Sequence, residues 1–287
     1  MNNSQLNKEH PKLQNDPDVF FDIGVALSGG SAKGFAHLGV LEYLEEHDMR
    51  PDVMSGTSMG SMMAALYCDG YSPKEIVEIF RGVNFTKMTE WLIPKGGIFG
   101  TKGFRQFLAS VLRHKRIEEL KIPLTIVATD LDHGCSKYFQ EGDLVDVITA
   151  SCSIPVLFKP VEIEGTYYVD GGLFKNLPAS VIRNRCKALI GVHVDPKESK
   201  EYKKNIFSIA ERSFNYIFRA NSIPDRKLCD VLIESALLSN VSRFDIDKAP
   251  RIAALGYNMA RKSLSGIDRT KLLSMGRAEK HIFSAPE

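Results

Sequence analysis

The sequence predicts an α/β protein with three layers (α/β/α), a mainly parallel central sheet and a helical C-terminal extension. Apolar runs of strand length, typical of strands buried on both faces, alternate with segments whose apolar residues recur at helical spacing. A chain of 287 residues, 44% of them hydrophobic, is also long enough to bury one sizeable core. Strands and helices that alternate in this way form a parallel sheet covered by helices on both faces.

The first half of the chain contains two strand–turn–helix units. The apolar run 20–27 predicts the first strand, and the helix after it is indicated by four apolar residues: Phe35, Leu38, Leu41 and Leu44. A second strand near Val53 leads into another helical stretch. A third helix begins at Ser72, which fits the cap position, with Pro73 at the first helical position and Glu75 three residues after the cap.

The second half of the chain supplies the remaining strands and the C-terminal helices. Strands are expected at 124–130, 136–139, 161–169 and 189–195. Beyond Pro196 the pattern is mostly helical and polar. We therefore divide the chain into a disordered tail at 1–20, a core at 21–199 and a helical extension at 200–287 that packs on the same domain.

A serine between two glycines is the first candidate site. Ser58 follows the second predicted strand and precedes a helix, with Gly56 and Gly60 two residues away on either side. This order is typical of a nucleophile elbow, a turn so tight that a side chain at either glycine would clash with the neighbouring strand or helix. The turn places the serine hydroxyl at the start of a helix, where free N–H groups point outward, ready to attack a carbonyl carbon.

A glycine-rich turn after the first strand is the second candidate site, and it contains Gly29, Gly30, Ser31, Lys33 and Gly34. Its free N–H groups are suited to holding a phosphate or a developing oxyanion, with the charge of Lys33 nearby. A tight structural turn is the other interpretation. A dinucleotide-binding turn does not fit, because Ser31 replaces the second glycine and no acidic residue follows the next strand to hold a ribose.

Asp170 is the candidate base for the serine. It ends a predicted strand and precedes Gly171 and Gly172, an arrangement that also suits an ordinary hairpin turn. No histidine has surroundings typical of a catalytic base, since His37 falls inside the first helix and His193 inside an apolar strand. A histidine-dependent hydrolase or acyltransferase is still an alternative, because the members of a catalytic triad need not be neighbours in the chain.

Together these segments resemble the patatin-like phospholipases, in particular the small bacterial members. The shared order is a strand, Gly-Gly-x-x-Lys-Gly, then Gly-x-Ser-x-Gly and finally Asp-Gly-Gly. The resemblance covers about residues 23–196 and includes four further segments: 128–131, 150–155, 158–160 and 176–178. One departure is Ser31, which stands where the family has a third glycine. Its side chain would narrow the space for an oxyanion or stiffen the loop.

The resemblance implies a serine lipid acyl hydrolase of phospholipase A, lysophospholipase or esterase type. Ser58 would be the nucleophile and Asp170 its base, and the N–H groups of the glycine-rich turn would hold the oxyanion beside Lys33. A lipid or acyl ester is then the substrate, and no cofactor is required. A catalytically weak lipid-binding regulatory protein is a further alternative, because Ser31 departs from the family pattern.

An apolar loop is expected between residues 84 and 102. Large apolar side chains occur there among glycines and a proline: Met88, Trp91, Leu92, Ile93, Ile98 and Phe99. They either fill the core or form a substrate entrance or lid in peripheral contact with a membrane.

Composition argues against several other classes. A formal charge of +2 with acids and bases well mixed gives no strong attraction to nucleic acid. The five scattered cysteines contain no Cys-x-x-Cys pair and predict reduced thiols rather than disulfides or metal ligands. No run approaches the roughly 20 apolar residues that a membrane-spanning helix needs. We expect a cytoplasmic protein without a metal site; the sequence predicts neither its oligomeric state nor its choice of head group or acyl chain.

Overall fold

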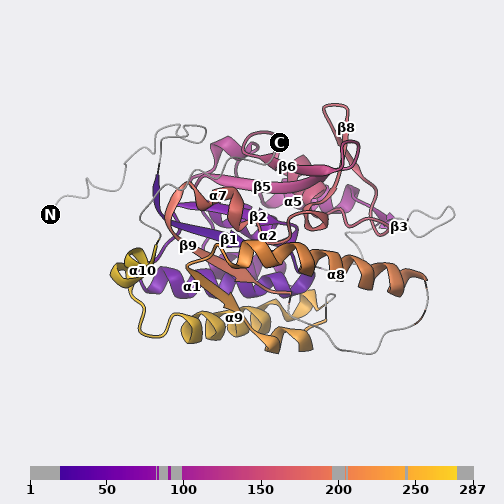
Figure 1. Cartoon of the computed structure of the whole chain (residues 1–287). Helices are drawn as coiled ribbons and strands as arrows, with labels where there is room; N and C mark the ends of the chain where they lie inside the picture. Colours follow the sequence, from indigo (N-terminus) through magenta and orange to yellow (C-terminus); the bar gives the residue numbers. More distant parts are fainter. Residues whose placement is uncertain are drawn as a thin grey trace.

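An eight-stranded mixed sheet lies at the centre of the part of the chain that the structure describes (Figure 1). The structure is a computed structural model, and it describes the following residues: 20–81, 83, 90–91, 99–195, 204, 206–242 and 245–276. The strand order is β10-β9-β1-β2-β5-β8-β7, with β6 paired to β5 beside this path. Helices cover both faces of the sheet, which confirms the predicted three-layer α/β/α fold class.

Parallel strands form one half of the sheet. Their bounds are β1 (Phe21–Leu27), β2 (Val53–Thr57), β5 (Leu124–Asp130), β9 (Cys186–His193) and β10 (Val231–Glu234). Leu27 lies opposite Gly56 on one side and opposite Val192 on the other. The carboxyl ends of β1 and β2 are therefore level, and the turns that follow these two strands lie at the same edge of the sheet.

Antiparallel strands complete the other half. They are β6 (Cys135–Phe139), β7 (Val161–Ile163) and β8 (Thr166–Asp170). The predicted strand run at 161–169 is thus a hairpin, whose turn places Glu164 and Gly165 at positive φ (51° and 81°). A separate two-stranded ladder pairs β3 (Glu90–Trp91) with β4 (Phe99–Gly100).

The helices follow the expected spacing of apolar residues. The α-helices are α1 (Ala36–Glu46), α2 (Met59–Cys68), α3 (Pro73–Phe80), α5 (Lys102–Val111), α6 (Leu144–Ser151), α7 (Ala179–Arg183), α8 (Ile206–Arg226), α9 (Ala249–Ser263) and α10 (Arg269–Met275). Short 3-10 turns are η1 (Ser31–Phe35), η2 (Ile117–Glu119), η3 (Gly171–Leu173), η4 (Ala236–Asn240) and η5 (Ile246–Lys248). The predicted capping box is present, because the Ser72 side chain accepts from the Glu75 N–H while Glu75 accepts from the Ser72 N–H.

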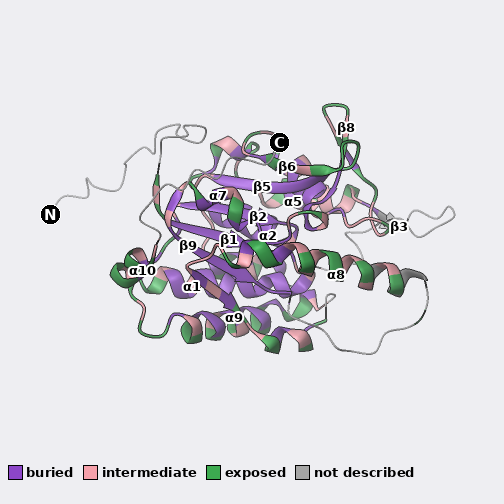
Figure 2. Cartoon of the chain, viewed as in Figure 1, coloured by how far each residue is buried: buried purple, intermediate pink, exposed green. Residues whose placement is uncertain are grey.

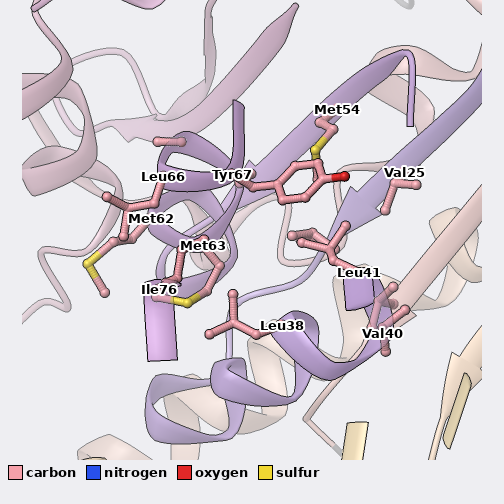
Figure 3. Packing of buried hydrophobic residues seen from close by; sticks show 14 of the residues in the cluster. Val25, Leu38, Val40, Leu41, Met54, Met62, Met63, Leu66, Tyr67 and Ile76 are labelled. Atoms are coloured by element: carbon pink, nitrogen blue, oxygen red, sulfur yellow. The ribbon is translucent and has the colours of Figure 1, made fainter. Parts of the chain in front are cut away.

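The main core lies between the sheet and the layer that contains α1, α2 and α9. Figure 3 shows Val25 of β1 and Met54 of β2 near Leu41 of α1 and the ring of Tyr67 of α2. Neighbouring residues of β1 point to the other face, where Ala26 belongs to a second buried cluster with residues of α7. Figure 2 shows that the central strands of the sheet are buried, while the outer faces of α8 and α9 are partly exposed.

The C-terminal segment contains one strand that the sequence analysis misses. β10 pairs with β9 in parallel and extends the central sheet, while α9 packs against α1. A strand of four residues is too short to show a periodic pattern among polar neighbours, which explains the omission.

Two sequence predictions fall largely outside the described residues. Only Phe20 of the tail at 1–20 is among them. Of the apolar loop at 84–102, the described residues are 90–91 and 99–102. Neither the disorder of the tail nor the lid role of the loop is tested by the structure. Among the described residues no helix combines the length and apolar character needed to cross a membrane.

Candidate active site

Ser58 occupies a strained turn between β2 and α2. It is the residue before the first turn of α2, and its φ of 52° and ψ of −127° lie outside the regions that non-glycine residues favour. A Cβ at Gly56 would lie 2.6 Å from the Cα of Ser61, and a Cβ at Gly60 would lie 2.5 Å from the Ser28 carbonyl oxygen. Both contacts are too short for any side chain, so the geometry is that of a nucleophile elbow.

The sheet register brings Asp170 to the level of Ser58. Thr57 lies opposite Val127 of β5, and Ala128 of β5 lies opposite Asp170 of β8. Ser58, the residue after β2, and Asp170, the last residue of β8, are therefore level on either side of β5. β8 runs antiparallel to β5, from the level of Asp130 toward the middle of that strand, so its last residue, Asp170, is level with Ala128.

Burial sets the proton affinity of Asp170. Its side chain is 1% exposed, and its Oδ1 accepts a hydrogen bond of 2.8 Å from the Gly172 N–H. Loss of water raises the pKa of the carboxyl from 3.8 to about 6, and the hydrogen bonds from Ser58 and Gly172 partly oppose this rise. The Ser58 hydroxyl is thus in reach of the carboxyl, yet Oδ2 of Asp170 has no hydrogen bond of regular geometry. Such contacts commonly tighten only when substrate binds.

One small cavity contains both side chains. Its volume is about 40 Å³, and its walls come from the glycine-rich turn, the elbow, the segment after α6, Asp170, Asn176, Asp195 and α8. Ser58 is 8% exposed. At this size the cavity holds only a few water molecules.

The glycine-rich turn offers two N–H donors rather than three. The Gly29 N–H donates to the carbonyl oxygen of Asn176 at 3.1 Å and is therefore not available to a ligand. The N–H groups of Gly30 and Ser31 have no acceptor among the described residues, as expected where the helical turn η1 begins. Ser31 adopts a φ of 49°, in the region that favours the glycine it replaces.

Lys33 lies beside the turn but does not present an isolated charge. Its side chain is 2% exposed, and its Nζ lies 3.5 Å from Oδ1 of Asp195, which lines the same cavity. The neighbouring carboxylate balances much of the positive field that the sequence analysis assigns to Lys33. Gly34 serves packing instead, because a Cβ there would overlap with the side chain of Met59 in α2.

Asn176 is a member of the site that was not predicted from the sequence. Asn176 is 1% exposed and lines the cavity, and its Nδ2 has no hydrogen-bond partner among the described residues. Its Oδ1 would lie 2.5 Å from a Cβ at Gly29 and 3.2 Å from one at Gly172, so bare glycines are what make room for the amide. The segment 176–178 enters the sequence analysis only through the family resemblance; a polar residue following the Asp-Gly-Gly turn is the signal that was available.

The two candidate histidines lie beneath the site rather than in it. Neither His37 nor His193 lines the cavity. His37 contacts the Ser28 carbonyl oxygen at 2.8 Å through Nε2, and burial lowers its pKa to about 4. The Nδ1 atom of His193 lies 3.5 Å from the carboxylate oxygen Oε2 of Glu234. The structure therefore places a carboxylate, and not an imidazole, next to Ser58.

No group of three or more histidine, cysteine or acidic side chains within the described part of the chain is arranged to hold a metal ion. One thiol does lie close to the candidate pair: burial and the Asp170 carboxylate raise the pKa of Cys152, while hydrogen bonds from Ser61 and Ser58 lower it. Cys152 is thus a neutral thiol against Ser58.

Comparisons with known proteins agree with this geometry. Residues 25–182 match the family model described as Patatin-like phospholipase. The chain is 32% identical over 218 residues to Uncharacterized protein YqhO of Bacillus subtilis (strain 168), covering 64% of this chain and 75% of that protein. It is 30% identical over 171 residues to Neuropathy target esterase sws of Drosophila melanogaster, covering 56% of this chain but only 12% of that much longer protein.

A solved structure supports the fold. The crystal structure of VipD from Legionella pneumophila aligns with a TM-score of 0.56 at 14% sequence identity, over 86% of this chain and 67% of that chain. The elbow, the glycine-rich turn and the Asp-Gly-Gly turn all lie within the region matched by the family model. The chain belongs to the patatin-like phospholipase family.

Proposed function

We propose that the protein is a serine lipid acyl hydrolase of phospholipase A, lysophospholipase or esterase type, with Ser58 as nucleophile and Asp170 as its base. The observation that carries the proposal is a buried carboxyl, with its pKa raised to about 6, at the same small cavity as a serine in an elbow. An aspartate of ordinary pKa is a poor match for a serine proton at neutral pH, and burial improves that match.

Acylation needs only groups that line the cavity. Asp170 accepts the proton of Ser58 while the serine oxygen bonds to the ester carbonyl carbon. The carbonyl oxygen becomes an oxyanion, held by the N–H groups of Gly30 and Ser31. The proton then passes from Asp170 to the leaving alcohol oxygen as the ester C–O bond breaks.

Deacylation repeats the steps with water. Asp170 takes a proton from the water as its oxygen attacks the acyl-serine, and the proton returns to Ser58 when the fatty acid leaves. The Asn176 amide supplies a third donor toward the oxyanion, replacing the N–H of Gly29 that is already bonded. The Lys33–Asp195 ion pair lies at the wall of the same cavity and helps to hold the turn in place.

A fluorophosphonate probe tests this proposal. The wild-type protein is expected to form a covalent adduct at Ser58, identified by mass spectrometry of peptides, and to hydrolyse members of a panel of phospholipids, lysophospholipids and soluble esters. Ser58→Ala is expected to lose both the adduct and the hydrolysis. A folded wild-type protein that binds lipid but neither reacts nor turns over would instead favour the regulatory alternative.

The pH dependence follows from the pKa of Asp170. The base acts only when deprotonated, so kcat/KM for a soluble, non-ionising ester is expected to fall about tenfold per pH unit below about pH 6 and to level off above it. His37→Phe should leave the profile unchanged. A profile that stays flat down to pH 4.5 would contradict a buried base.

Asn176→Ala is expected to lower kcat by about tenfold to a hundredfold with little change in KM, because a donor to the oxyanion acts mainly in the transition state. Asn221→Ala is the control for loop position: the Asn221 side chain accepts from the backbone N–H of Asn176 and donates to the carbonyl oxygens of Gly172 and Leu173, without lining the cavity. Initial rates measured at several ester concentrations give kcat and KM separately. Equal losses in both variants would mean that Asn176 only shapes the loop.

A further inference from the structure

Helix α8 covers the cavity with one face and exposes large apolar side chains on the other. Ala210, Phe214 and Phe218 line the cavity. Ile209, Tyr216 and Ile223, at intervals of seven residues, are 47%, 52% and 50% exposed. Because seven residues make about two helical turns, these three side chains form one stripe along the helix, on the side away from the cavity.

A row of arginines runs along one edge of this stripe. Arg212, Arg219 and Arg226 also recur every seven residues. Both Arg212 and Arg219 lie three residues after one member of the stripe and four residues before the next, so each is a neighbour of two stripe residues on the helix surface. The Arg212 Nε donates to the Tyr216 hydroxyl at 2.8 Å. Arg226 binds Glu234, whereas Arg219 makes no ion pair with another described residue. The span Ile206–Arg226 carries three arginines against two acidic residues.

We propose that the outer stripe of α8 binds the surface of an anionic lipid bilayer, and that this contact draws α8 away from the cavity so that an acyl chain reaches Ser58. The second half of this inference rests on the proposed function. The surface involved consists of Ile209, Tyr216 and Ile223 with the flanking Arg212 and Arg219, and we call it the α8 outer face.

The chemistry of the α8 outer face fits a lipid surface. An apolar stripe with arginines at its edge lets the aliphatic side chains enter the acyl boundary while the guanidinium groups meet phosphate head groups. Tyrosine, with an apolar ring and a polar tip, prefers this boundary. A second copy of the chain would bring the same arginines face to face, where like charges repel.

Exposed apolar residues continue beside the cavity. Val156 lines the cavity and is 43% exposed, and Phe174, which directly follows η3, is 46% exposed. α8 packs against η3. Val156 is thus an exposed apolar side chain at the cavity itself, and Phe174 is another beside the turn against which α8 packs.

The size of the cavity requires a movement. About 40 Å³ holds a few water molecules, which is much less than an acyl chain needs. Phe214 and Phe218, whose ring centroids are 6.4 Å apart, are the aromatic side chains that α8 contributes to the wall. Moving this helix would enlarge the cavity and present two aromatic rings to the acyl chain.

Vesicle binding of an Ile209→Ser/Ile223→Ser variant tests the first half. Each isoleucine that enters the acyl boundary contributes about tenfold or more to affinity, so the double variant is expected to bind vesicles of phosphatidylglycerol and phosphatidylcholine about a hundredfold more weakly. Met275→Ser is the matched control, because Met275 is 41% exposed on α10, away from the cavity. Arg219→Gln is expected to weaken binding to the anionic vesicles and not to pure phosphatidylcholine.

The rate of fluorophosphonate labelling at Ser58 tests the second half. Anionic vesicles are expected to accelerate labelling of the wild-type protein and of Met275→Ser, but not of the double variant. Unchanged vesicle affinity in the double variant, or a wild-type dimer that the double variant dissociates in sedimentation, would overturn the inference. Hydrolysis of a soluble short-chain ester without vesicles separates this result from failure of the proposed function, because that reaction should survive in the double variant.

Discussion

Asp170→Asn is expected to reduce kcat/KM for ester hydrolysis by about 10⁴-fold or more and, at the same time, to make the protein more stable at neutral pH. The activity falls because asparagine cannot accept the Ser58 proton, and losing a member of a catalytic pair typically costs this much. Asparagine has nearly the same shape, and its Oδ1 can still accept the hydrogen bond that Gly172 donates to Asp170.

The gain in stability follows from the sign of the pKa shift. Burial raises the pKa of Asp170 from 3.8 in an exposed chain to about 6 in the folded protein. Between these values the folded state binds more protons than the unfolded state, so the free energy of unfolding falls as pH rises through this window. Above about pH 6 the ionised, buried carboxylate costs about 3 kcal/mol, which the neutral amide avoids.

Urea denaturation at pH 4 and pH 7 checks this prediction. At pH 4 the wild-type protein and Asp170→Asn should have similar free energies of unfolding. At pH 7 the free energy of unfolding of Asp170→Asn should be higher by up to about 3 kcal/mol. His37→Phe serves as the control for activity. A histidine-dependent mechanism would lose turnover in His37→Phe and retain turnover in Asp170→Asn. Full activity of Asp170→Asn would remove Asp170 from the mechanism.

The sequence predicts the local turns of the site well, because each turn carries its own chemical signature. A Cβ at Gly56 or Gly60 would lie only 2.5–2.6 Å from atoms of Ser61 or Ser28, so glycine is required at both positions. Such a requirement can be recognised in the sequence itself. Asp170 is a candidate base from the residues, because no histidine has suitable surroundings, and the family resemblance then implies its pairing with Ser58. Only the register of β2, β5 and β8 shows why two side chains so far apart in the chain are level.

The features that the sequence did not predict depend on partners distant in the chain. The Gly29 N–H looks free in the sequence, yet it bonds to Asn176, and Lys33 faces Asp195. α8 shows a helical pattern, but which of its faces covers the cavity depends on where the helix lies against η3. β10 is a strand only because β9 offers it an edge.

The contact between α1 and α9 leads to the second large prediction, which concerns stability. A Cβ at Gly256 of α9 would overlap with the carbonyl oxygen of Ala36, the first residue of α1. A Cβ at Gly39 of α1 would likewise overlap with the carbonyl oxygen of Ala253. The two helices thus touch backbone to backbone, and neither obstacle is a flexible side chain that can turn aside.

Gly256→Val is therefore expected to lower the free energy of unfolding by about 3 kcal/mol or more, because the helices must separate along their whole contact. Ala254→Val, on the exposed side of the same helix, should cost less than about 1 kcal/mol, since it changes only helix propensity.

Gly256→Ala gives the sharpest comparison. In an open helix it would stabilise by about 1 kcal/mol, whereas here it should destabilise, and a stabilised Gly256→Ala in thermal unfolding would show that α1 and α9 do not pack this closely. Because Ala36 directly follows η1, a shift of α1 would also disturb the N–H groups of Gly30 and Ser31, so esterase activity should fall together with stability.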